Sequence, residues 1–474
     1  MNPIETEIAV VGGGPGGYAA AFHAADKGKK VILVDRDKRL GGVCLNRGCI
    51  PSKALLHAVK VMREARESEA RGVVFPKPKV SLEKMRAWKE SILERLGQGI
   101  HQLGEKRGVE RMQGRGYFEN SCMIRVETSE GQKFVHYQKA IIAVGSKPAM
   151  PKAFDLGNPR VMTSTEALEL PEIPRTLLVV GGGYIGLELG TIYAELGSEI
   201  VLVEALNSLL PGIDPDLVAP VARCAKAQFK EVRLETKVAK MSTYKKQIKV
   251  SFDANGEEKK ELYDRVLVAV GRVPDCADLG LENTKVKINE KGFIQVNPYM
   301  ETPDPYINAI GDAVGGALLA HKATKEGRIA VESAIGERVR FDSVIPAVVF
   351  TDPEVAWCGL TETEARAKGI SVKTVRFPWS ASGRALTFDR PDGITKLIIE
   401  PETERILGVG ITGYGAGELI SEGVLAIEMG ATAEDLAESV HPHPTLSETL
   451  MECAEIFYGR ATHSLSGRRR NAAE

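Results

Sequence analysis

Two cysteines, Cys44 and Cys49, lie close together in a chain whose other five cysteines are isolated. A close pair of this kind is a candidate for redox chemistry or for metal binding. No second cysteine pair or matching histidine pair accompanies it, so a four-ligand zinc site is disfavoured and no metal site is predicted. On a regular helix, residues five apart have Cα atoms roughly 8.6 Å apart, and a disulfide needs less than about 7 Å. A bonded pair would therefore require a distorted helix, which Gly48 permits.

The segment from His441 to Glu448 places possible bases near an acid. It reads His-Pro-His-Pro-Thr-Leu-Ser-Glu. A histidine pKa near ~6.5 suits the ring to take up and return a proton, and a carboxylate can fix its tautomer and stabilise the imidazolium. The spacing of Thr445 and Glu448 is also that of a capping box at the start of a helix, in which case the histidines would be packing residues.

Two glycine-rich loops share one pattern. Each has a strand, G-x-G-x-x-G, a helix rich in small residues, and a second strand that ends in an acid 18 residues after the last glycine. Glycine permits the tight turn, lets the backbone approach a pyrophosphate and lets helix and strand pack closely, while the acid can bind ribose. One motif is a weak signal, but two in register predict two bound dinucleotides. The predicted contact residues are Gly12, Gly14, Gly17 and Asp35 in the first loop, and Gly181, Gly183, Gly186 and Glu204 in the second.

Alternating strands and helices must position these motifs, which indicates an α/β fold. Two further strand-then-glycine segments, 140–145 and 265–271, would close the two nucleotide-binding units. After residue 344 no glycine motif recurs, and the pattern predicts a separate α+β domain. Its expected strands are 344–350 and 396–400, and its expected helices are 418–429 and 433–439.

Composition excludes several classes of protein. With 62 Lys+Arg against 63 Asp+Glu the net charge is −1, which gives no reason to expect nucleic-acid binding. The one basic run, Arg468–Arg470, is expected to be a solvated tail. No apolar stretch approaches the ~18–20 residues that span a bilayer. The first seven residues resemble neither a secretory signal nor a transit peptide, so we expect a cytoplasmic protein without a membrane span.

The segment 41–53, G-G-V-C-L-N-R-G-C-I-P-S-K, resembles the active-site signature of the pyridine nucleotide–disulfide oxidoreductases. The match is to the class-I branch, which has four residues between the cysteines, and the resemblance covers essentially the whole chain. It implies that Cys44 and Cys49 form a redox disulfide. It also implies that Cys49 lies against a flavin and that Cys44 is the outer thiol that meets the substrate.

The resemblance implies further roles near the flavin and at the C-terminus. Lys53 would lie near the flavin and pair with Glu188, which would border the nicotinamide. The alternative for both residues is an exposed charge on a helix. His443 would be the catalytic base and Glu448 its orienting carboxylate, contributed by the other subunit of a homodimer. His441 shares the His-Pro pattern but not the motif position, so no role is assigned to it.

The resemblance also implies a domain order: two Rossmann-like dinucleotide-binding domains, for FAD and NAD, then a central domain and a C-terminal α+β dimerisation domain. The predicted boundaries are 1–147 for FAD, 148–270 for NAD, 271–343 for the central domain and 344–474 for the dimer-interface domain. Further FAD contacts are implied at Gly116, Asp312 and Ala320, and further NAD contacts at Val238 and Gly271.

Glu204 predicts NAD rather than NADP, because a carboxylate accepts from the 2′-hydroxyl and repels a 2′-phosphate. The segments 320–323, 353–360 and 377–385 resemble the family branch that acts on lipoyl groups. The implied activity is oxidation of protein-bound dihydrolipoamide to lipoamide. The implied partner is the lipoyl-bearing acyltransferase of a 2-oxo acid dehydrogenase complex, or the lipoyl carrier of glycine cleavage. The alternatives are an NAD(P)H-dependent reductase of another disulfide and a non-catalytic FAD-binding scaffold.

Three positions depart from the family pattern, and one of them is Pro442, where alanine is common. Asp35 is one methylene shorter than the more usual glutamate. Arg47 stands between the cysteines, where an apolar residue is commoner. We hypothesise that the charge of Arg47 biases the stability of a cysteine thiolate.

Overall fold

The computed structural model describes residues 2–254 and 257–464, and the chain forms two compact units. Unit 1 consists of Met1–Ile173 and Leu267–Asp342, and unit 2 consists of Pro174–Val266 and Ser343–Glu474. Each unit combines two segments of the predicted domain order, and the four boundaries themselves stay a prediction. Among the described residues, no helix is long and apolar enough to cross a membrane. The basic run Arg468–Arg470 lies outside the described residues.

Unit 1 is built on a mixed sheet whose parallel part carries the first glycine loop. The strand order is β3-β2-β1-β6-β5-β4, and β17 also pairs with β6. β1 runs parallel to both β2 and β6, so its residues Ala9 and Val10 are fully buried. The strands are β1 (Ile4–Val11), β2 (Val31–Asp35), β3 (Glu110–Gln113), β4 (Arg115–Asn120), β5 (Met123–Thr128), β6 (Gly131–Ile142) and β17 (Ile307–Ala309).

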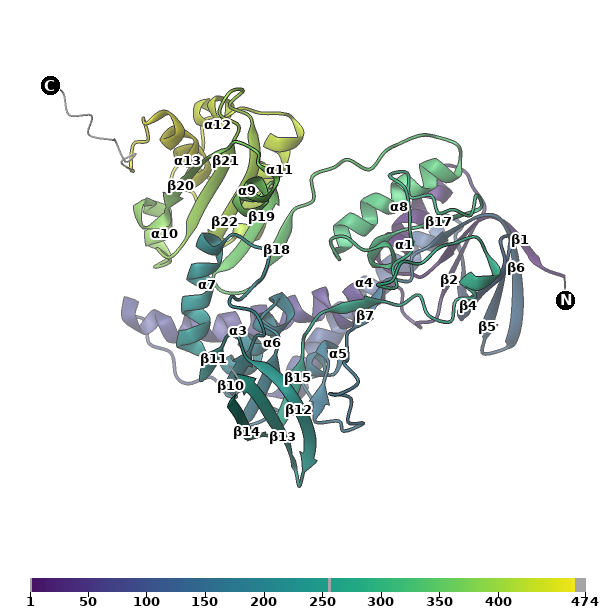
Figure 1. The fold of residues 1–474 in the computed structure, drawn as a ribbon, viewed down its shortest axis with the longest axis horizontal. Coiled ribbons are helices and arrows are strands. Elements are labelled where there is room, and N and C mark those ends of the chain that lie inside the picture. The colour runs from purple at the N-terminus through teal and green to yellow at the C-terminus, as the bar shows by residue number, and fades with distance from the viewer. Residues whose placement is uncertain (1, 255–256, 465–474) are drawn as a thin grey trace. The chain divides into compact units, whose positions relative to one another are not determined.

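Two helices of unit 1, α1 (Pro15–Asp26) and α8 (Ala320–Ala334), lie side by side (Figure 1). They approach closely because small residues face each other. A Cβ added at Gly327 would lie 2.6 Å from the carbonyl oxygen of Gly16. This packing joins the first glycine loop to the segment that contains Asp312 and Ala320. The other elements of unit 1 include α2 (Gly42–Arg47), α3 (Cys49–Glu67), α4 (Leu82–Lys106), α5 (Ser164–Leu168), β7 (Ser146–Pro148), β16 (Arg272–Pro274) and the 3-10 turn η3 (Gly311–Val314).

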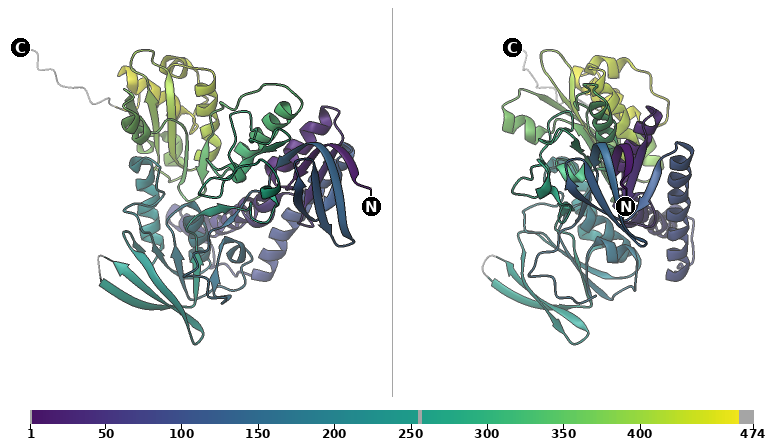
Figure 2. Two further views of the ribbon diagram at one scale, coloured as in Figure 1. Left: turned by 45° about the vertical axis from the view of Figure 1, so that its right-hand side comes forward. Right: turned by 90° about the vertical axis from the view of Figure 1, so that its right-hand side faces the viewer.

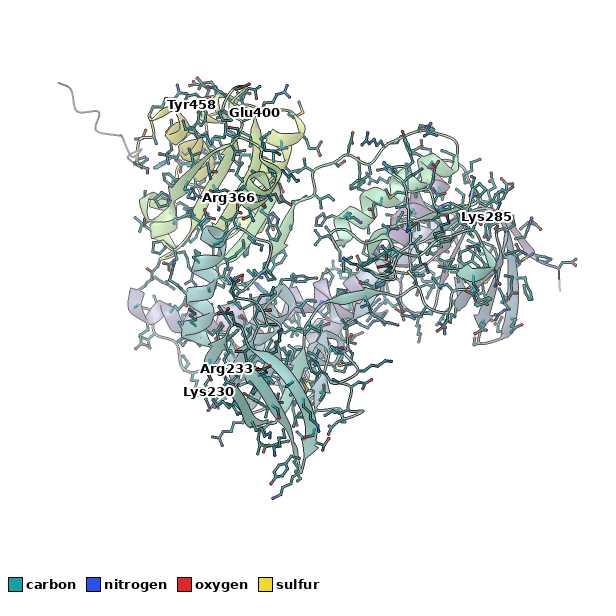
Figure 3. The ribbon with its side chains drawn as sticks, viewed as in Figure 1. Lys230, Arg233, Lys285, Arg366, Glu400 and Tyr458 are labelled. Atoms are coloured by element: carbon teal, nitrogen blue, oxygen red, sulfur yellow. The ribbon has the colours of Figure 1, made fainter. Side chains whose placement is uncertain are left out.

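The first half of unit 2 repeats the strand–loop–helix–strand pattern. Its parallel strands follow the order β11-β10-β9, and an antiparallel sheet, β12-β13-β14, follows them in the chain (Figure 2). Arg233, labelled in Figure 3, joins the two sheets: its guanidinium binds Glu261 at 3.0 Å and lies over the ring of Phe252. The elements are β9 (Thr176–Val180), α6 (Tyr184–Glu195), β10 (Glu199–Val203), α7 (Pro215–Gln228), β11 (Glu231–Arg233), β12 (Lys237–Tyr244), β13 (Gln247–Ala254), β14 (Glu257–Tyr263) and β15 (Arg265–Val268).

The second half of unit 2 is the predicted α+β domain. Its antiparallel sheet has the order β18-β19-β22-β21-β20 and packs against helices, as expected from the sequence. Lys396 of β21, only 1% exposed, connects this sheet to the α7 segment by binding Asp214 at 2.9 Å. The elements are β18 (Ala347–Val349), β19 (Glu354–Gly359), α9 (Glu362–Lys368), β20 (Lys373–Pro378), α10 (Gly383–Thr387), β21 (Ile394–Ile399), β22 (Ile406–Gly413), α11 (Ala416–Glu428), α12 (Ala433–Glu438) and α13 (Glu448–Tyr458).

Candidate active site and dinucleotide loops

The first glycine loop has the backbone that the sequence predicted. Gly12 has φ +107°, and its N–H donates to the carbonyl of Val34 at 2.8 Å. A Cβ on Gly17 would lie 1.8 Å from the carbonyl oxygen of Gly12, so no side chain fits there. Among the described residues no side chain caps α1, which starts at Pro15. Its first N–H groups are therefore available to an anion.

Asp35 closes this loop from the end of β2. Its carboxylate accepts hydrogen bonds from the N–H of Gly13 and from the N–H of Asp37, the latter at 2.6 Å. Burial raises the pKa of Asp35, and the neighbouring carboxylate of Asp37 acts in the same direction, while the two backbone N–H donors lower it. Asp35 thus holds the loop in shape, and its contact with a ribose stays a prediction.

The second loop repeats this construction in unit 2. Gly181 has φ +111°, and a Cβ on Gly186 would lie 2.1 Å from the carbonyl oxygen of Gly181. Glu204 accepts from the N–H of Gly182 at 2.7 Å and from the N–H of Leu206 at 2.9 Å. Both loops therefore fit a dinucleotide pyrophosphate in backbone shape, helix start and terminal acid.

The other predicted cofactor contacts are distributed over both units. Gly116 is buried in β4, Ala320 begins α8, and Asp312 lies in η3, all in unit 1. Val238 lies in β12 of unit 2, whereas Gly271 belongs to unit 1 with φ +128°. The contacts of these five residues with FAD or NAD stay predictions.

Asp312 is held by residues that sequence reasoning missed. The hydroxyl of Ser146 donates to its carboxylate, and the buried pair Lys322–Glu326 braces the turn that carries it. Glu326 accepts from the N–H of Gly311 at 2.7 Å, and Lys322 donates to the carbonyl of Gly315 at 3.0 Å. Lys322 and Glu326 are four apart on α8, a spacing that the sequence does show.

The two cysteines lie on either side of a helix break. α2 ends at Arg47, Gly48 has φ −147° and ψ −109°, and α3 starts at Cys49, which confirms the predicted distortion at Gly48. Cys44 is half-buried and Cys49 is exposed. A hydrogen bond with Cys49 raises the pKa of Cys44, burial and Asp312 raise it further, and Lys53 lowers it. The break thus brings two thiols five residues apart into direct contact.

Arg47 and Asn46 tie α2 to the segment after Asp35. The guanidinium of Arg47 binds the carboxylate of Asp37 at 2.6 Å, and Arg39 donates to the side-chain oxygen of Asn46 at 2.6 Å. The positive charge of Arg47 is therefore balanced by Asp37. This contact assigns Arg47 to the attachment of α2, and its effect on the thiolate stays a hypothesis.

Glu188 is not the exposed helical charge that the alternative supposed. It lies on α6 with 3% exposure and accepts from the N–H of Phe350 at 3.0 Å. Lys53 is half-buried on α3. A buried carboxylate in the second glycine-loop helix is consistent with a binding role, and its pairing with Lys53 stays a prediction.

His443 and Glu448 form the predicted pair. Nδ1 of His443 lies 2.8 Å from Oε1 of Glu448, and 75% of the histidine side chain is exposed. Oε2 of Glu448 accepts from the N–H of Thr445 at 2.7 Å. Burial opposes ionisation of Glu448, but this N–H and His443 outweigh it, so the pKa of Glu448 lies below its usual value. Nε2 of His443 has no hydrogen-bond partner among the described residues and can accept a proton.

The capping-box alternative is only half right. Glu448 does reach back to the N–H of Thr445, but α13 begins at Glu448 with Ser447 at its N-cap. The hydroxyl of Thr445 donates instead to the carbonyl of Pro442 at 2.8 Å. One carboxylate therefore serves both the helix start and His443.

No group of three or more His, Cys, Asp or Glu side chains within the described residues is arranged to hold a metal ion. The two acid-closed glycine loops, the thiol pair and the His–Glu pair are the only arrangements that the sequence singled out for chemistry. Together they describe a protein that holds two dinucleotides and exchanges electrons through sulfur.

Two family models match the chain. Residues 6–327 match the pyridine nucleotide-disulphide oxidoreductase model, and residues 345–454 match the dimerisation domain of the same family. The second match makes the protein a homodimer, in agreement with the sequence-based expectation.

Curated relatives and solved structures agree with these matches. The chain is 45% identical over 461 residues to dihydrolipoyl dehydrogenase of Vibrio cholerae, covering 97% of both chains. It is 45% identical over 465 residues to dihydrolipoyl dehydrogenase of Thermus scotoductus, covering 97% of this chain and 99% of that one. LpdA of Mycobacterium tuberculosis superposes with a TM-score of 0.89 at 25% identity, covering 95% of this chain and 99% of that chain. The chain belongs to the pyridine nucleotide-disulphide oxidoreductase family.

Proposed function

We propose that Cys44, Cys49, His443 and Glu448 carry the oxidation of dihydrolipoamide in this chain. The activity follows from relatives matched over nearly their full length that are dihydrolipoyl dehydrogenases at 42–45% identity, and FAD and NAD are the cofactors. The observation that carries the residue assignment is the helix break at Gly48, which brings the two thiols into contact.

The cysteines exchange disulfide bonds with the substrate. Starting from the Cys44–Cys49 disulfide, a substrate thiolate attacks Sγ of Cys44 and releases Cys49 as a thiolate. The second substrate thiolate then displaces Cys44, which closes the lipoamide disulfide and leaves both cysteines reduced. Two electrons and two protons leave the substrate in this sequence. FAD, which the first glycine loop would hold, would supply the acceptor for these two electrons, and NAD, which the second loop would hold, would supply the final hydride acceptor.

His443 handles the protons of this exchange. Its Nε2 accepts the proton of the first substrate thiol, releases it to water and then accepts the proton of the second, which is necessary because the thiolate is the nucleophile in both attacks. Glu448 accepts from Nδ1, so it fixes the tautomer and stabilises the imidazolium. We propose that this pair serves the cysteines of the other subunit in the homodimer.

The cofactors are assigned to the two loops by the residues that fit them. In the proposal, Gly12, Gly14, Gly17 and Asp35 hold FAD, with Gly116, Asp312, Ala320 and Lys53 as further contacts. Gly181, Gly183, Gly186 and Glu204 hold NAD, with Val238, Gly271 and Glu188 as further contacts. Glu204 supports NAD over NADP because its carboxylate repels a 2′-phosphate.

The partner and the location are also proposals. We infer that the lipoyl group arrives on the acyltransferase of a 2-oxo acid dehydrogenase complex or on the glycine-cleavage carrier, because the relatives act on lipoyl groups. We place the protein in the cytoplasm, because a reducing compartment keeps the thiol pair available for redox exchange.

Steady-state turnover of dihydrolipoamide with NAD and, separately, with NADP tests this proposal. We expect rapid NAD turnover, weak NADP turnover and little NADH-driven reduction of glutathione disulfide. Cys44→Ser and Cys49→Ser should abolish turnover, and His443→Gln should lower kcat by about 10²- to 10⁴-fold. A protein with bound FAD and a reducible cysteine pair that fails to oxidise dihydrolipoamide would contradict the substrate assignment. Efficient glutathione disulfide reduction would favour the alternative reductase.

A further inference from the structure

His441, two residues before His443, has different surroundings. Only 7% of its side chain is exposed, against 75% for His443. Its Nδ1 lies 2.8 Å from the carbonyl oxygen of Ser439, and its Nε2 lies 2.6 Å from Oε1 of Glu422. A carbonyl and a carboxylate are both acceptors, so the ring donates from both nitrogens and carries a positive charge. His441 therefore has no nitrogen left to accept a proton.

We propose that His441 is a positioning residue for the base His443, an inference that rests on the proposed function above. The His441–Glu422 contact attaches the start of the segment to α11, and Glu448 attaches its end to α13. His443 stands between these two attachments. Pro442 and Pro444 further restrict the backbone between them. The ring of His443 is thereby oriented from both sides, while its Nε2 stays available for the substrate.

The charges around the two histidines are nearly balanced. Glu422 on α11 faces His441, and Glu448 at the start of α13 faces both histidines. The positive charge of His463, which follows α13 in the chain, lowers the pKa of Glu448. At the end of α12, the carboxylate of Glu438 is held by Arg460 at 2.6 Å. The hydrogen bond with Glu422 raises the pKa of His441, burial opposes it, and the Ser439 carbonyl and the charge of Glu448 add to the rise.

This balance predicts different effects for the two partners. Replacing His441 leaves the Glu422 carboxylate without its positive partner, which adds a net negative charge beside the segment that carries His443. Replacing Glu422 returns His441 toward its ordinary pKa, so the site keeps nearly the same net charge but loses the attachment to α11. A merely structural pair would give neither pattern, since it would act on folding alone.

His441→Gln and Glu422→Gln, compared as intact FAD-loaded dimers, test the proposal. His136→Gln is the matched control, because His136 binds Glu5 at 2.7 Å in unit 1, outside the site. For dihydrolipoamide and NAD we expect both site variants to lower kcat by about 10- to 100-fold with KM changed less than about threefold. In the pH profile of kcat, the acidic limb should move to higher pH in His441→Gln and should stay in place in Glu422→Gln. The control should match the wild type in both measurements.

A second measurement reads His443 without any turnover. The pH dependence of its modification by diethylpyrocarbonate, located by peptide mass spectrometry, gives its pKa in each variant. We expect a higher value in His441→Gln and no change in Glu422→Gln or His136→Gln. If the wild type fails to oxidise dihydrolipoamide, the proposed function fails, and this titration alone decides the role of His441. Wild-type kcat and an unshifted His443 in His441→Gln would overturn the proposal. A kcat loss that tracks lost FAD or a lowered melting temperature in both variants would also overturn it.

Discussion

The two glycine loops have the same backbone but different surroundings. In each, the first glycine has φ near the same value, +107° at Gly12 and +111° at Gly181. In each, the acid at the end of the second strand accepts from the N–H of the second glycine, Asp35 from Gly13 and Glu204 from Gly182. One local sequence pattern therefore specifies one local structure twice.

The difference lies in what covers the loops. Both loops are contacted at their second glycine, whose carbonyl accepts from the N–H of Gly41 at 2.8 Å in the first loop and from the N–H of Leu210 at 3.0 Å in the second. The first loop is also covered by the start of α2, where a Cβ on Gly42 would lie 2.7 Å from Cα of Gly14. The corresponding glycine of the second loop, Gly183, has no atom within 4 Å of an added Cβ. The terminal acids differ in the same sense, since Asp35 is buried and Glu204 is half-buried.

This difference fits two cofactors with different residence times. FAD must stay through every turnover, whereas NAD must enter and NADH must leave each time. The first loop opens only when α2, the helix that carries Cys44, moves away from it. Such local opening costs free energy in proportion to the contacts that are broken. We therefore expect FAD release to depend on the contacts of α2 and NAD binding to be independent of them.

The largest effect should come from the third glycine of each loop. Gly17→Ala and Gly186→Ala place a Cβ about equally close to backbone oxygen, 1.8 Å and 2.1 Å. We expect Gly17→Ala to yield protein with roughly tenfold or more less bound FAD, because the backbone must shift at the covered loop. Gly186→Ala should retain FAD, and its dissociation constant for NADH should rise by a similar factor. Flavin absorbance and NADH titration measure the two effects, and equal FAD loss in both variants would contradict the loop assignment.

A smaller effect should follow from Gly42, which covers the first loop. Gly42→Ala forces a Cβ toward Gly14 at a residue with φ +57°, so we expect FAD release about 10- to 30-fold faster. Gly212→Ala is the control, because Gly212 also has a positive φ, +93°, but no atom lies within 4 Å of an added Cβ. Release of FAD is followed by the gain in flavin fluorescence after dilution. Similar release rates in the two variants would show that backbone strain alone matters.

Replacing Asp35 should have a smaller effect than replacing these glycines. We expect it to stabilise the apoprotein and to weaken the binding of FAD. The folded-state pKa of Asp35 is raised above that of the unfolded chain, so the ionised carboxylate destabilises the apoprotein at neutral pH. This cost disappears as the pH falls through the raised pKa. Asp35→Asn should therefore raise the melting temperature of the apoprotein by about 1–2 °C at pH 7, with the gain lost in mild acid.

The same variant should release FAD about tenfold faster, because a neutral amide binds ribose and the backbone N–H groups less strongly than a carboxylate. Glu204→Asn offers the comparison in the second loop and should leave FAD release unchanged. An apoprotein destabilised by Asp35→Asn at pH 7 would show that the two backbone hydrogen bonds outweigh the burial of the charge.

Local spacing made a good part of the site predictable. The glycine loops, the helix break at Gly48 and the contact of His443 with Glu448 all join residues close in sequence, where helix and turn geometry set the distances. Two strands and two helices after residue 344 were also predicted, and the structure has β18, β21, α11 and α12 at these places, with β18 shorter than expected. The other strands and helices of this region were not predicted.

The missed contacts join residues that no spacing rule connects. Ser146 reaches Asp312 across 166 positions, and Glu422 reaches His441 from a different helix. Which distant side chains come into contact depends on how the helices and strands pack. The spacing of residues in a single sequence does not specify that packing. The antiparallel sheet β12-β13-β14 was missed for another reason: its alternating residues Ile248, Val250 and Phe252 signal a strand, but they lie outside the motifs that directed the prediction.

The smallest effect should come from Arg47, whose ion pair with Asp37 attaches α2 to the first loop. Both side chains are partly exposed, 32% and 23%, so the pair contributes about 1 kcal/mol or less. Arg47→Val should speed FAD release by about two- to fivefold. The thiolate titration of the cysteine pair should stay unchanged, because Asp37 balances the guanidinium charge and Cys44 responds to Cys49, burial, Lys53 and Asp312.

Arg107→Val is the matched control, since Arg107 pairs with Asp26 at 2.9 Å elsewhere in unit 1 with a similar exposure of 33%. FAD release from this control should equal that of the wild type. A shifted thiolate titration in Arg47→Val would restore the hypothesis that Arg47 acts on the thiolate through its charge. If FAD release is unchanged in Arg47→Val, the ion pair does not hold α2 over the first loop. The contacts of Gly41 and Gly42 alone would then keep the loop covered.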